Sequence, residues 1–192
     1  SWQSIREVIY QPQGQFLSYV IAPQEGDAVL VIHNTLNKVD IKIQRGAQGA
    51  FTEDGRFFIA KIKPLFQETR KAKIDKKKAD EMPKDSLVIV NLTTGNIERI
   101  ASVKSFQLPV KGNDQLVYLK DKKGDINKDG SDLVWVDLNS KISKTFSNIS
   151  QYQIHPKGMG VAMYQVKTKT NNSKILLANL VDSLPKPIST NF

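Results

Sequence analysis

Residues 51–60 read Phe51-Thr-Glu-Asp-Gly-Arg-Phe-Phe-Ile-Ala60, which is a polar turn followed by an apolar strand. A glycine beside Asp, Asn or Lys supplies the positive φ of a tight hairpin, and a short run of Val, Ile, Leu, Phe and Tyr favours a strand. The same order of turn and strand occurs four times, with spacings of 41, 57 and 46 residues, at Gly14, Gly55, Gly112 and Gly158. The sequence therefore predicts a chain built from repeats.

A second apolar strand follows each first one and ends in a polar residue. These four closing residues are His33, Asn91, Asp137 and Asn179. The 192 residues divide into four units of about 48, close to the ~40–50 residues of a four-stranded propeller blade. A β-sandwich is the alternative all-β fold, but it predicts no in-phase repeat of two strand types. We predict an all-β chain of about four consecutive four-stranded β-propeller-type blades, as a partial or open propeller.

The repeats set approximate boundaries for the blades within one partial β-propeller domain, residues 1–192. The predicted blades span 1–46, 47–101, 102–147 and 148–192. The second contains a charged insert, residues 61–85, with nine Lys or Arg and five Asp or Glu. Because so many charges are costly to bury, we expect this insert to protrude from the blade.

Composition narrows the possible functions. The chain has no cysteine, which excludes disulfides and thiolate zinc sites, and no apolar run approaches the length of a membrane span. The net charge of +9 raises the question of nucleic acid. The triple lysine Lys76-Lys77-Lys78 is interleaved with Asp75, Asp80 and Glu81 and has few aromatic neighbours. We therefore expect a solvated insert that binds no nucleic acid.

The sequence contains no recognisable catalytic apparatus. The Gly-x-Ser-x-Gly elbow of serine hydrolases is absent, as are a phosphate loop and a dinucleotide fingerprint. The histidines, His33 and His155, stand at a strand end and at a turn, where a hydrogen-bonding role is usual. We expect no catalytic residue and no cofactor, and no peptidase activity from this chain alone.

One loop is suggestive of a metal site. Residues 125–130 match the first six positions of a calcium loop, with candidate ligands Asp125, Asn127 and Asp129. The twelfth position, where a bidentate acid is needed, is Val136. Turn formation alone also favours Asp, Asn and Gly. We expect calcium affinity no better than millimolar, and hence no functional metal site.

The ordered series of motifs resembles the N-terminal propeller of bacterial serine peptidases of the prolyl oligopeptidase family. The resemblance runs nearly end to end, through the entry at Trp2, the stretches 14–27, 52–64 and 82–92, and residues 103–109 and 129–133. It implies a propeller that caps a C-terminal α/β-hydrolase domain and limits which peptides reach the catalytic serine. The elbow and triad have no counterpart in this sequence, so no catalytic residue is carried over.

Two functions follow as hypotheses. The first is a non-catalytic, substrate-gating fragment of a periplasmic or secreted serine peptidase, with the hydrolase domain and peptide substrates as partners. The second is a stand-alone propeller-like scaffold that binds a protein or a glycan. In either case we expect the isolated chain to self-associate, because its terminal blades would leave apolar residues uncovered near Phe16 and Tyr19 or near Val161 and Met163.

Overall fold

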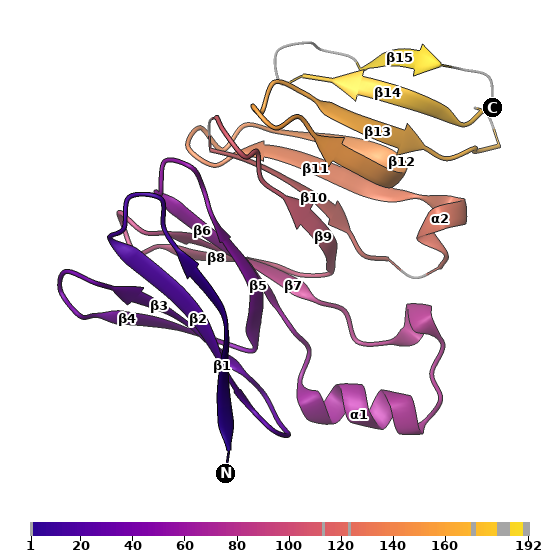
Figure 1. The fold of residues 1–192 in the computed structure, drawn as a ribbon. Helices are drawn as coiled ribbons and strands as arrows, with labels where there is room; N and C mark the ends of the chain where they lie inside the picture. The colour runs from indigo at the N-terminus through magenta and orange to yellow at the C-terminus, as the bar shows by residue number, and fades with distance from the viewer. Residues whose placement is uncertain (1, 113, 123, 170–171, 180–184, 190–192) are drawn as a thin grey trace. The chain divides into compact units, whose positions relative to one another are not determined.

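The computed structural model describes residues 2–112, 114–122, 124–169, 172–179 and 185–189. By its internal contacts the chain divides into two compact units, Ser1–Ser102 and Val103–Phe192. Antiparallel strands are the main secondary structure of both units and are joined mainly by tight turns (Figure 1). None of the helices in these ranges is long and apolar enough to cross a membrane.

Unit 1 contains two four-stranded antiparallel sheets, each a simple meander in sequence order. The first sheet, blade 1, is formed by β1 (Gln3–Tyr10), β2 (Phe16–Pro23), β3 (Val29–Asn34) and β4 (Asp40–Gln44). The second sheet, blade 2, is formed by β5 (Gly46–Phe51), β6 (Phe57–Ile62), β7 (Ser86–Asn91) and β8 (Ile97–Ile100). Between β6 and β7 the insert forms the helix α1 (Phe66–Ile74) and the 3₁₀ turn η1 (Ala79–Glu81).

Unit 2 differs, because its two repeats share one strand. Its seven-stranded sheet has the order β15-β14-β13-β12-β11-β10-β9. The strand β12 runs for 12 residues and pairs with β11 through its first part and with β13 through its last part. The elements are β9 (Val103–Gln107), β10 (Gln115–Lys120), α2 (Ile126–Asp129), β11 (Ser131–Asp137), β12 (Ser143–Ile154), β13 (Val161–Gln165), β14 (Lys174–Ala178) and β15 (Lys186–Ser189). We call the sheet from β9 to the first part of β12 blade 3 and the remainder blade 4.

Each unit has its own hydrophobic core. In unit 1, apolar side chains of β2 and β3 pack against those of β6 and β7, with Phe58 fully buried between them. In unit 2, Trp135 of β11 is fully buried among residues of β10, β12, β13 and β14. Both cores therefore lie between two consecutive repeats of the chain.

A repeated backbone feature marks the junction from one repeat to the next. Three non-glycine residues with φ between 56° and 62° stand there, namely Arg45, Ser102 and Asn148. The residue after each is buried, and the carbonyls of Arg45 and Asn148 accept backbone N–H groups of Lys63 and Val166, both at 2.9 Å. A left-handed backbone conformation is unfavourable for residues other than glycine. These hydrogen bonds stabilise it where the chain passes from one repeat to the next.

The sequence prediction of the uncovered residues was wrong in part. Phe16, Val161 and Met163 are 7%, 0% and 2% exposed, because they belong to the two cores. Side chains alternate between the faces of a strand, so the neighbours of these residues in sequence point to the opposite face. Tyr19, three residues after Phe16 on the same strand, lies on that opposite face and is only partly buried.

Candidate functional site

Short turns lie at the same end of both blades in unit 1, and side chains hold them. Gly14 and Gly55 have φ of 76° and 70°, as tight turns require. Gln11 is buried, and its Oε1 accepts the N–H groups of Gln15 and Phe16 at 3.0 and 3.1 Å. Its Nε2 donates to the carbonyl of Gly55 at 2.6 Å, so one side chain organises the first turn and ties it to the second.

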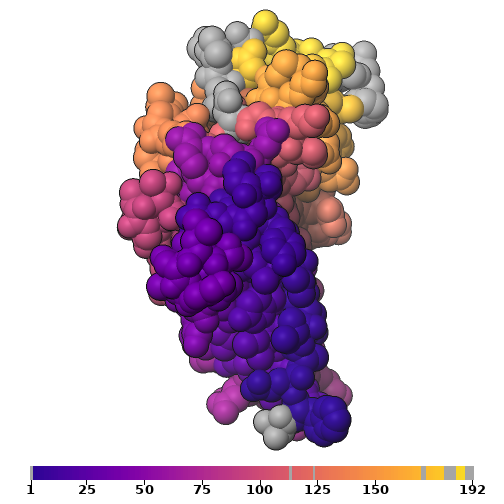
Figure 2. All heavy atoms as spheres, turned by 60° about the vertical axis from the view of Figure 1, so that its left-hand side comes forward, coloured from indigo at the N-terminus to yellow at the C-terminus, as the bar shows by residue number. Residues whose placement is uncertain are grey.

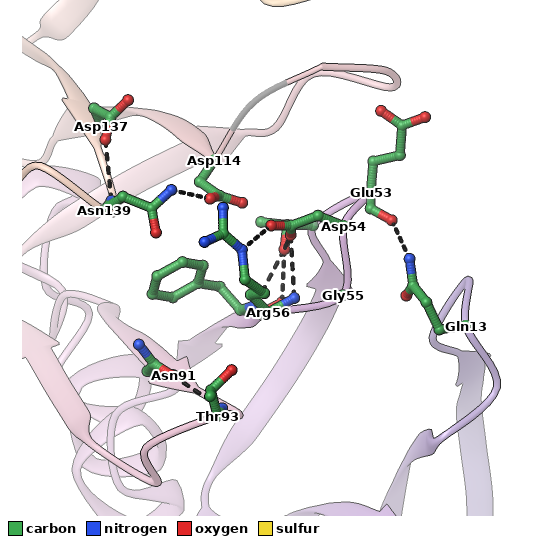
Figure 3. A network of polar contacts seen from close by, with 12 residues as sticks. Gln13, Glu53, Asp54, Gly55, Arg56, Asn91, Thr93, Asp114, Asp137 and Asn139 are labelled. Carbon is green, nitrogen blue, oxygen red and sulfur yellow. Dashed lines mark hydrogen bonds and ion pairs between the residues drawn. The ribbon is translucent and has the colours of Figure 1, made fainter.

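Further contacts extend this rim of turns. The amide of Gln13 donates to the carbonyl of Glu53 at 2.8 Å, and Arg56 forms an ion pair with Asp54 (Figure 3). The hydroxyl of Thr52 donates to Asp54 at 2.7 Å. These contacts hold the turns in shape and give the rim a polar surface.

A second set of turns repeats almost identically, and it corrects the alignment made from sequence. The side-chain oxygen of Asn91 accepts the N–H groups of the second and third residues after it, each at 3.0 Å. Asp137 does the same at 3.0 and 2.8 Å, and Asn34 at 2.9 and 3.3 Å. The residue equivalent to Asn91 is therefore Asn34, not His33, because only Asn34 has an oxygen placed to accept these bonds.

Both histidines take part in local hydrogen bonds. The Nδ1 of His33 lies 2.7 Å from Oδ1 of Asp40 on the neighbouring strand β4. The Nδ1 of His155 accepts the N–H of Lys157 at 3.1 Å within a turn. These contacts are the strand-end and turn roles that the sequence indicates for the two residues.

The calcium-like loop folds as one helical turn. Asp125 caps α2, because its Oδ1 accepts the N–H of Asn127 at 3.0 Å. Gly130 follows with φ of 60°. The carbonyl of Asp129 accepts a bond from Lys122 at 3.3 Å. Among the described residues, no group of three or more acidic or histidine side chains is placed to hold a metal ion.

The insert is anchored to its own unit, although much of it is exposed. The N–H of Phe66 donates to Oδ1 of Asp27 at 2.8 Å. This hydrogen bond joins the β2–β3 loop of blade 1 to the start of α1. Ala72 is 3% exposed, whereas Ile74 is 71% exposed. The lysines at 76–78 are all exposed, which fits the predicted solvated surface.

A basic pocket of about 450 Å³ lies in unit 1 at the end of blade 2 opposite the glycine turns. It is lined by four cationic side chains, Arg45, Lys63, Lys84 and Arg99, and no acidic side chain lines it. The guanidinium of Arg45 donates to the carbonyl of Lys63 at 3.0 Å. Outside the pocket, Asp85 lies 2.8 Å from Nζ of Lys63 and also pairs with Lys61.

Sequence reasoning missed the basic pocket. Its cations come from the β4–β5 junction, the end of β6, the start of β7 and the end of β8. Each is an ordinary surface residue in its own segment, and only the closing of the meander brings them together. The excess of cations in residues 61–85 is the one sequence signal that pointed to this region.

Comparisons with known proteins find matches among solved structures alone. No protein-family model and no curated protein sequence matches the chain. Among solved structures, the chain is similar to the β-propeller domain of the trilobed protease from Pyrococcus furiosus, which has an open velcro topology. That match has a TM-score of 0.56 and 13% identity, and covers 98% of this chain and 58% of that one. The chain has the fold of part of a β-propeller domain.

Two further matches are also peptidases. One is a prolyl endopeptidase, with a TM-score of 0.56 and 10% identity over 99% of this chain and 30% of that one. The other is the acylaminoacyl peptidase of Pyrococcus horikoshii, with a TM-score of 0.52 and 10% identity over 98% of this chain and 32% of that one. The chain thus spans between about a third and three-fifths of these structures. The predicted partial or open propeller of four-stranded repeats is confirmed.

Proposed function

We propose that this chain is the non-catalytic N-terminal propeller part of a prolyl oligopeptidase-family serine peptidase. In this proposal it controls the access of peptides to a C-terminal α/β-hydrolase domain. The observation that carries the proposal is the match of almost the whole chain to propeller-containing peptidases at TM-scores of 0.52 to 0.56. In the matched prolyl endopeptidases, inter-domain dynamics have a role in catalysis and specificity. The proposal includes a periplasmic or secreted location for the parent protein.

The architecture of the blades suits a gate. Each turn at the rim of unit 1 is held by backbone bonds, as between Gly14 and Gln11 and between Gly55 and Thr52, both at 2.9 Å. Side chains such as Gln11 add bonds from one blade to the next. A wall built in this way excludes bulky substrates by shape and needs no reactive group.

The basic pocket gives the gate a charge preference. Lys63 is paired with Asp85 at 2.8 Å, but Arg45, Lys84 and Arg99 also line the hollow of about 450 Å³ and leave it an excess of positive charge, which attracts carboxylates. Arg45 and Arg99 present planar guanidinium groups, which bind carboxylates in a bidentate way. We therefore extend the proposal to peptides with acidic residues as the favoured substrates.

The proposal is tested on the gene and on the enzyme it encodes. The coding sequence after residue 192 is expected to encode an α/β-hydrolase pattern with a Gly-x-Ser-x-Gly elbow. Deletion of residues 1–192 is expected to raise cleavage of a folded protein substrate relative to cleavage of a short chromogenic peptide. A stop codon at this point, or an unchanged ratio in a folded deletion variant, would contradict the proposal and favour the stand-alone scaffold.

The charge preference has its own control. The double variant Arg45→Gln/Arg99→Gln is expected to lower kcat/KM for a Glu-containing peptide and to leave that for its Gln-containing analogue unchanged. The matched variant Lys38→Gln/Lys141→Gln removes two cations from exposed turns outside the pocket. Equal effects of the two double variants would show that only overall charge matters.

A further inference from the structure

The basic pocket of unit 1 lies where the core between blades 1 and 2 ends. Strand pairing places Ile62 of β6 opposite Ser86 of β7, and Ala60 opposite Val88, so these four side chains share one face of blade 2. This face packs against blade 1, because Ala60, Ile62 and Val88 belong to the same core as Ile43. In Figure 2 the closely packed indigo and purple atoms of blade 1 form the front of unit 1. The pocket therefore lies between two blades that are both complete four-stranded sheets.

Polar side chains replace apolar ones at the edge of this face. Arg99 of β8 pairs with Val88, so it continues the same face at the exposed side of the sheet. Ser86 and Gln44 contribute a hydroxyl and an amide to the lining, beside the buried apolar residue Ile62. Among the described residues, the guanidinium of Arg99 has no hydrogen-bond or ion-pair partner. Its N–H groups are therefore available to a ligand.

The second guanidinium of the pocket, that of Arg45, is held in place by several hydrogen bonds. The N–H of Arg45 donates to the carbonyl of Ala28 at 2.7 Å, and its carbonyl accepts the N–H of Lys63 at 2.9 Å. Its Nη1 donates to the carbonyl of Lys63 at 3.0 Å. One nitrogen thus fixes the group, and the other N–H groups of the guanidinium point away from this bond. A ligand that binds them loses little additional side-chain freedom.

The positive charge of the pocket exceeds what a single carboxylate offsets. Outside the pocket one carboxylate, that of Asp85, serves two lysines, Lys63 at 2.8 Å and Lys61 at 3.2 Å. Arg45 and Arg99 add two guanidinium groups to the lining. A carboxylate ligand carries one negative charge, whereas a phosphate monoester carries about −1.5 to −2 at pH 7 and has three acceptor oxygens. The phosphate monoester therefore matches the charge and the donors of this pocket better than a carboxylate does.

We propose that the basic pocket binds a phosphate group, with Arg45 and Arg99 on its oxygens and with Ser86 and Gln44 as neutral donors. The group is carried by a phosphorylated peptide side chain or is free inorganic phosphate, and both have the same tetrahedral, multiply charged chemistry. Clusters of arginine recognise phosphorylated peptides through bidentate hydrogen bonds. The preference for a phosphorylated over an acidic substrate rests on the proposed function, whereas the binding site itself requires unit 1 alone.

Calorimetric titration of the chain at low salt tests the site with three probes. These are a blocked tripeptide with a central phosphoserine, the same tripeptide with Glu, and inorganic phosphate. At pH 7.5 the phosphopeptide should bind at least about tenfold more tightly than the Glu peptide, because it gains a charge-assisted hydrogen bond. Binding of the phosphopeptide at least as tight as that of inorganic phosphate identifies a peptide as the source, and the reverse order identifies free phosphate. Equal affinities for the phosphopeptide and the Glu peptide, or no binding of either phosphate probe, would overturn the proposal.

The pH dependence of this preference tests the role of the second negative charge. The charged side chains at the pocket are Arg45, Lys63, Lys84 and Arg99, with Asp85 beside Lys63, and no histidine lines it. Arginine and lysine as residue types stay charged from pH 5.5 to pH 7.5. A phosphate monoester loses its second charge near pH 6, whereas the carboxylate of a Glu peptide remains ionised. The preference for the phosphopeptide should therefore fall about fourfold at pH 5.5, and an unchanged preference would contradict the proposal.

Variants of the two arginines test where the phosphate binds. Arg99→Gln removes an exposed guanidinium and should weaken phosphopeptide binding about tenfold or more. Arg45→Lys keeps the charge without the bidentate geometry and should also weaken binding. The control Lys38→Gln removes a cation from an exposed turn at the other end of β4 and should bind as the wild type does.

Thermal melts confirm that each variant is folded, and if Arg45→Lys is not, Arg99→Gln decides. Equal weakening by Arg99→Gln and Lys38→Gln would overturn the proposal, because it would show attraction by overall charge alone. The failure of this site and the failure of the proposed gate are distinguishable. Phosphate binding is measured on the chain itself, whereas the gate is tested on the gene and by peptidase activity.

Discussion

The two units join their blades in different ways. In unit 1 the chain breaks strand pairing at Arg45, and contacts such as Gln11 with Gly55 and Asp27 with Phe66 tie one sheet to the other. In unit 2 a single strand, β12, runs through both repeats, and their sheets are continuous. The same repeat can thus be linked to the next by side chains across a gap or by an unbroken strand, and in both units a core lies between the two repeats.

This comparison predicts that the two cores fail separately. Phe58→Ala in unit 1 and Trp135→Ala in unit 2 each remove a fully buried aromatic ring, at an expected cost of about 3–5 kcal/mol. Because Trp2 is 89% exposed, the fluorescence of buried Trp135 reports mainly on unit 2. In urea, Phe58→Ala should lower the midpoint seen by circular dichroism more than the midpoint seen by fluorescence. Equal shifts of both midpoints would show that the units unfold as one.

Removal of the side-chain link in unit 1 is expected to have the next largest effect on the free energy of unfolding. Gln11→Ala removes a buried amide that bonds to backbone groups of Gly55, Gln15 and Phe16. Those groups then lose this hydrogen-bond partner. The expected loss is about 1–3 kcal/mol. The control Gln13→Ala removes an exposed bond and should cost no more than about 0.5 kcal/mol. Similar losses in the two variants would mean that the buried link adds nothing specific.

The sequence was sufficient to predict the repeat, but not the backbone conformation at the junctions between repeats. Turn glycines and strand-forming runs are local signals, and they predicted the fold class because each repeat folds through nearby contacts. The left-handed residues Arg45 and Asn148 carry no such signal, since neither is a glycine. The sharing of β12 by two repeats depends on pairing from both sides, which the alternation of its own residues does not reveal.

The candidate surfaces show the same limit. Uncovered apolar residues were predicted at the wrong positions of the strands, because the inward and outward positions of a strand differ by one residue. Phe16 and Met163 are core residues, while Leu177 lies outside. The basic pocket joins four segments that are distant in sequence, and nothing local indicates that Arg45 and Arg99 share a hollow.

A polar link in unit 2 gives a pH-dependent prediction. The hydroxyl of Tyr152 lies 3.0 Å from that of Ser105, and burial raises the pKa of Tyr152 from 10.0 to about 12, against a smaller lowering by this bond. A raised pKa stabilises the fold below pH 10.0, and this contribution is lost as the pH rises toward 12. Tyr152→Phe should cost about 1 kcal/mol at neutral pH. The difference in free energy of unfolding between this variant and the wild type should shrink between pH 10.0 and 12. Urea unfolding measures that difference.

The control for this prediction is Tyr10→Phe, since Tyr10 is 66% exposed. That variant should follow the wild type at every pH. A difference in free energy of unfolding between Tyr152→Phe and the wild type that stays constant into the alkaline range would contradict the role assigned to burial.

The smallest expected effect is that of calcium on unit 2. Asp125 already caps α2, and incomplete oxygen ligation predicts affinity no better than about millimolar. Micromolar calcium should leave the fluorescence melt of Trp135 unchanged. Calorimetric binding in the low micromolar range that Asp129→Ala abolishes would show that the loop rearranges into a metal site.

The central proposal is that this chain controls access to a catalytic domain and does not itself catalyse. The most direct measurement is labelling of the purified chain with a fluorophosphonate probe, which reacts with activated serine nucleophiles. We predict no labelling of residues 1–192, and strong labelling of the longer peptidase that the proposal expects from the same gene. Labelling of the isolated chain that disappears when a single serine is replaced by alanine would contradict the account.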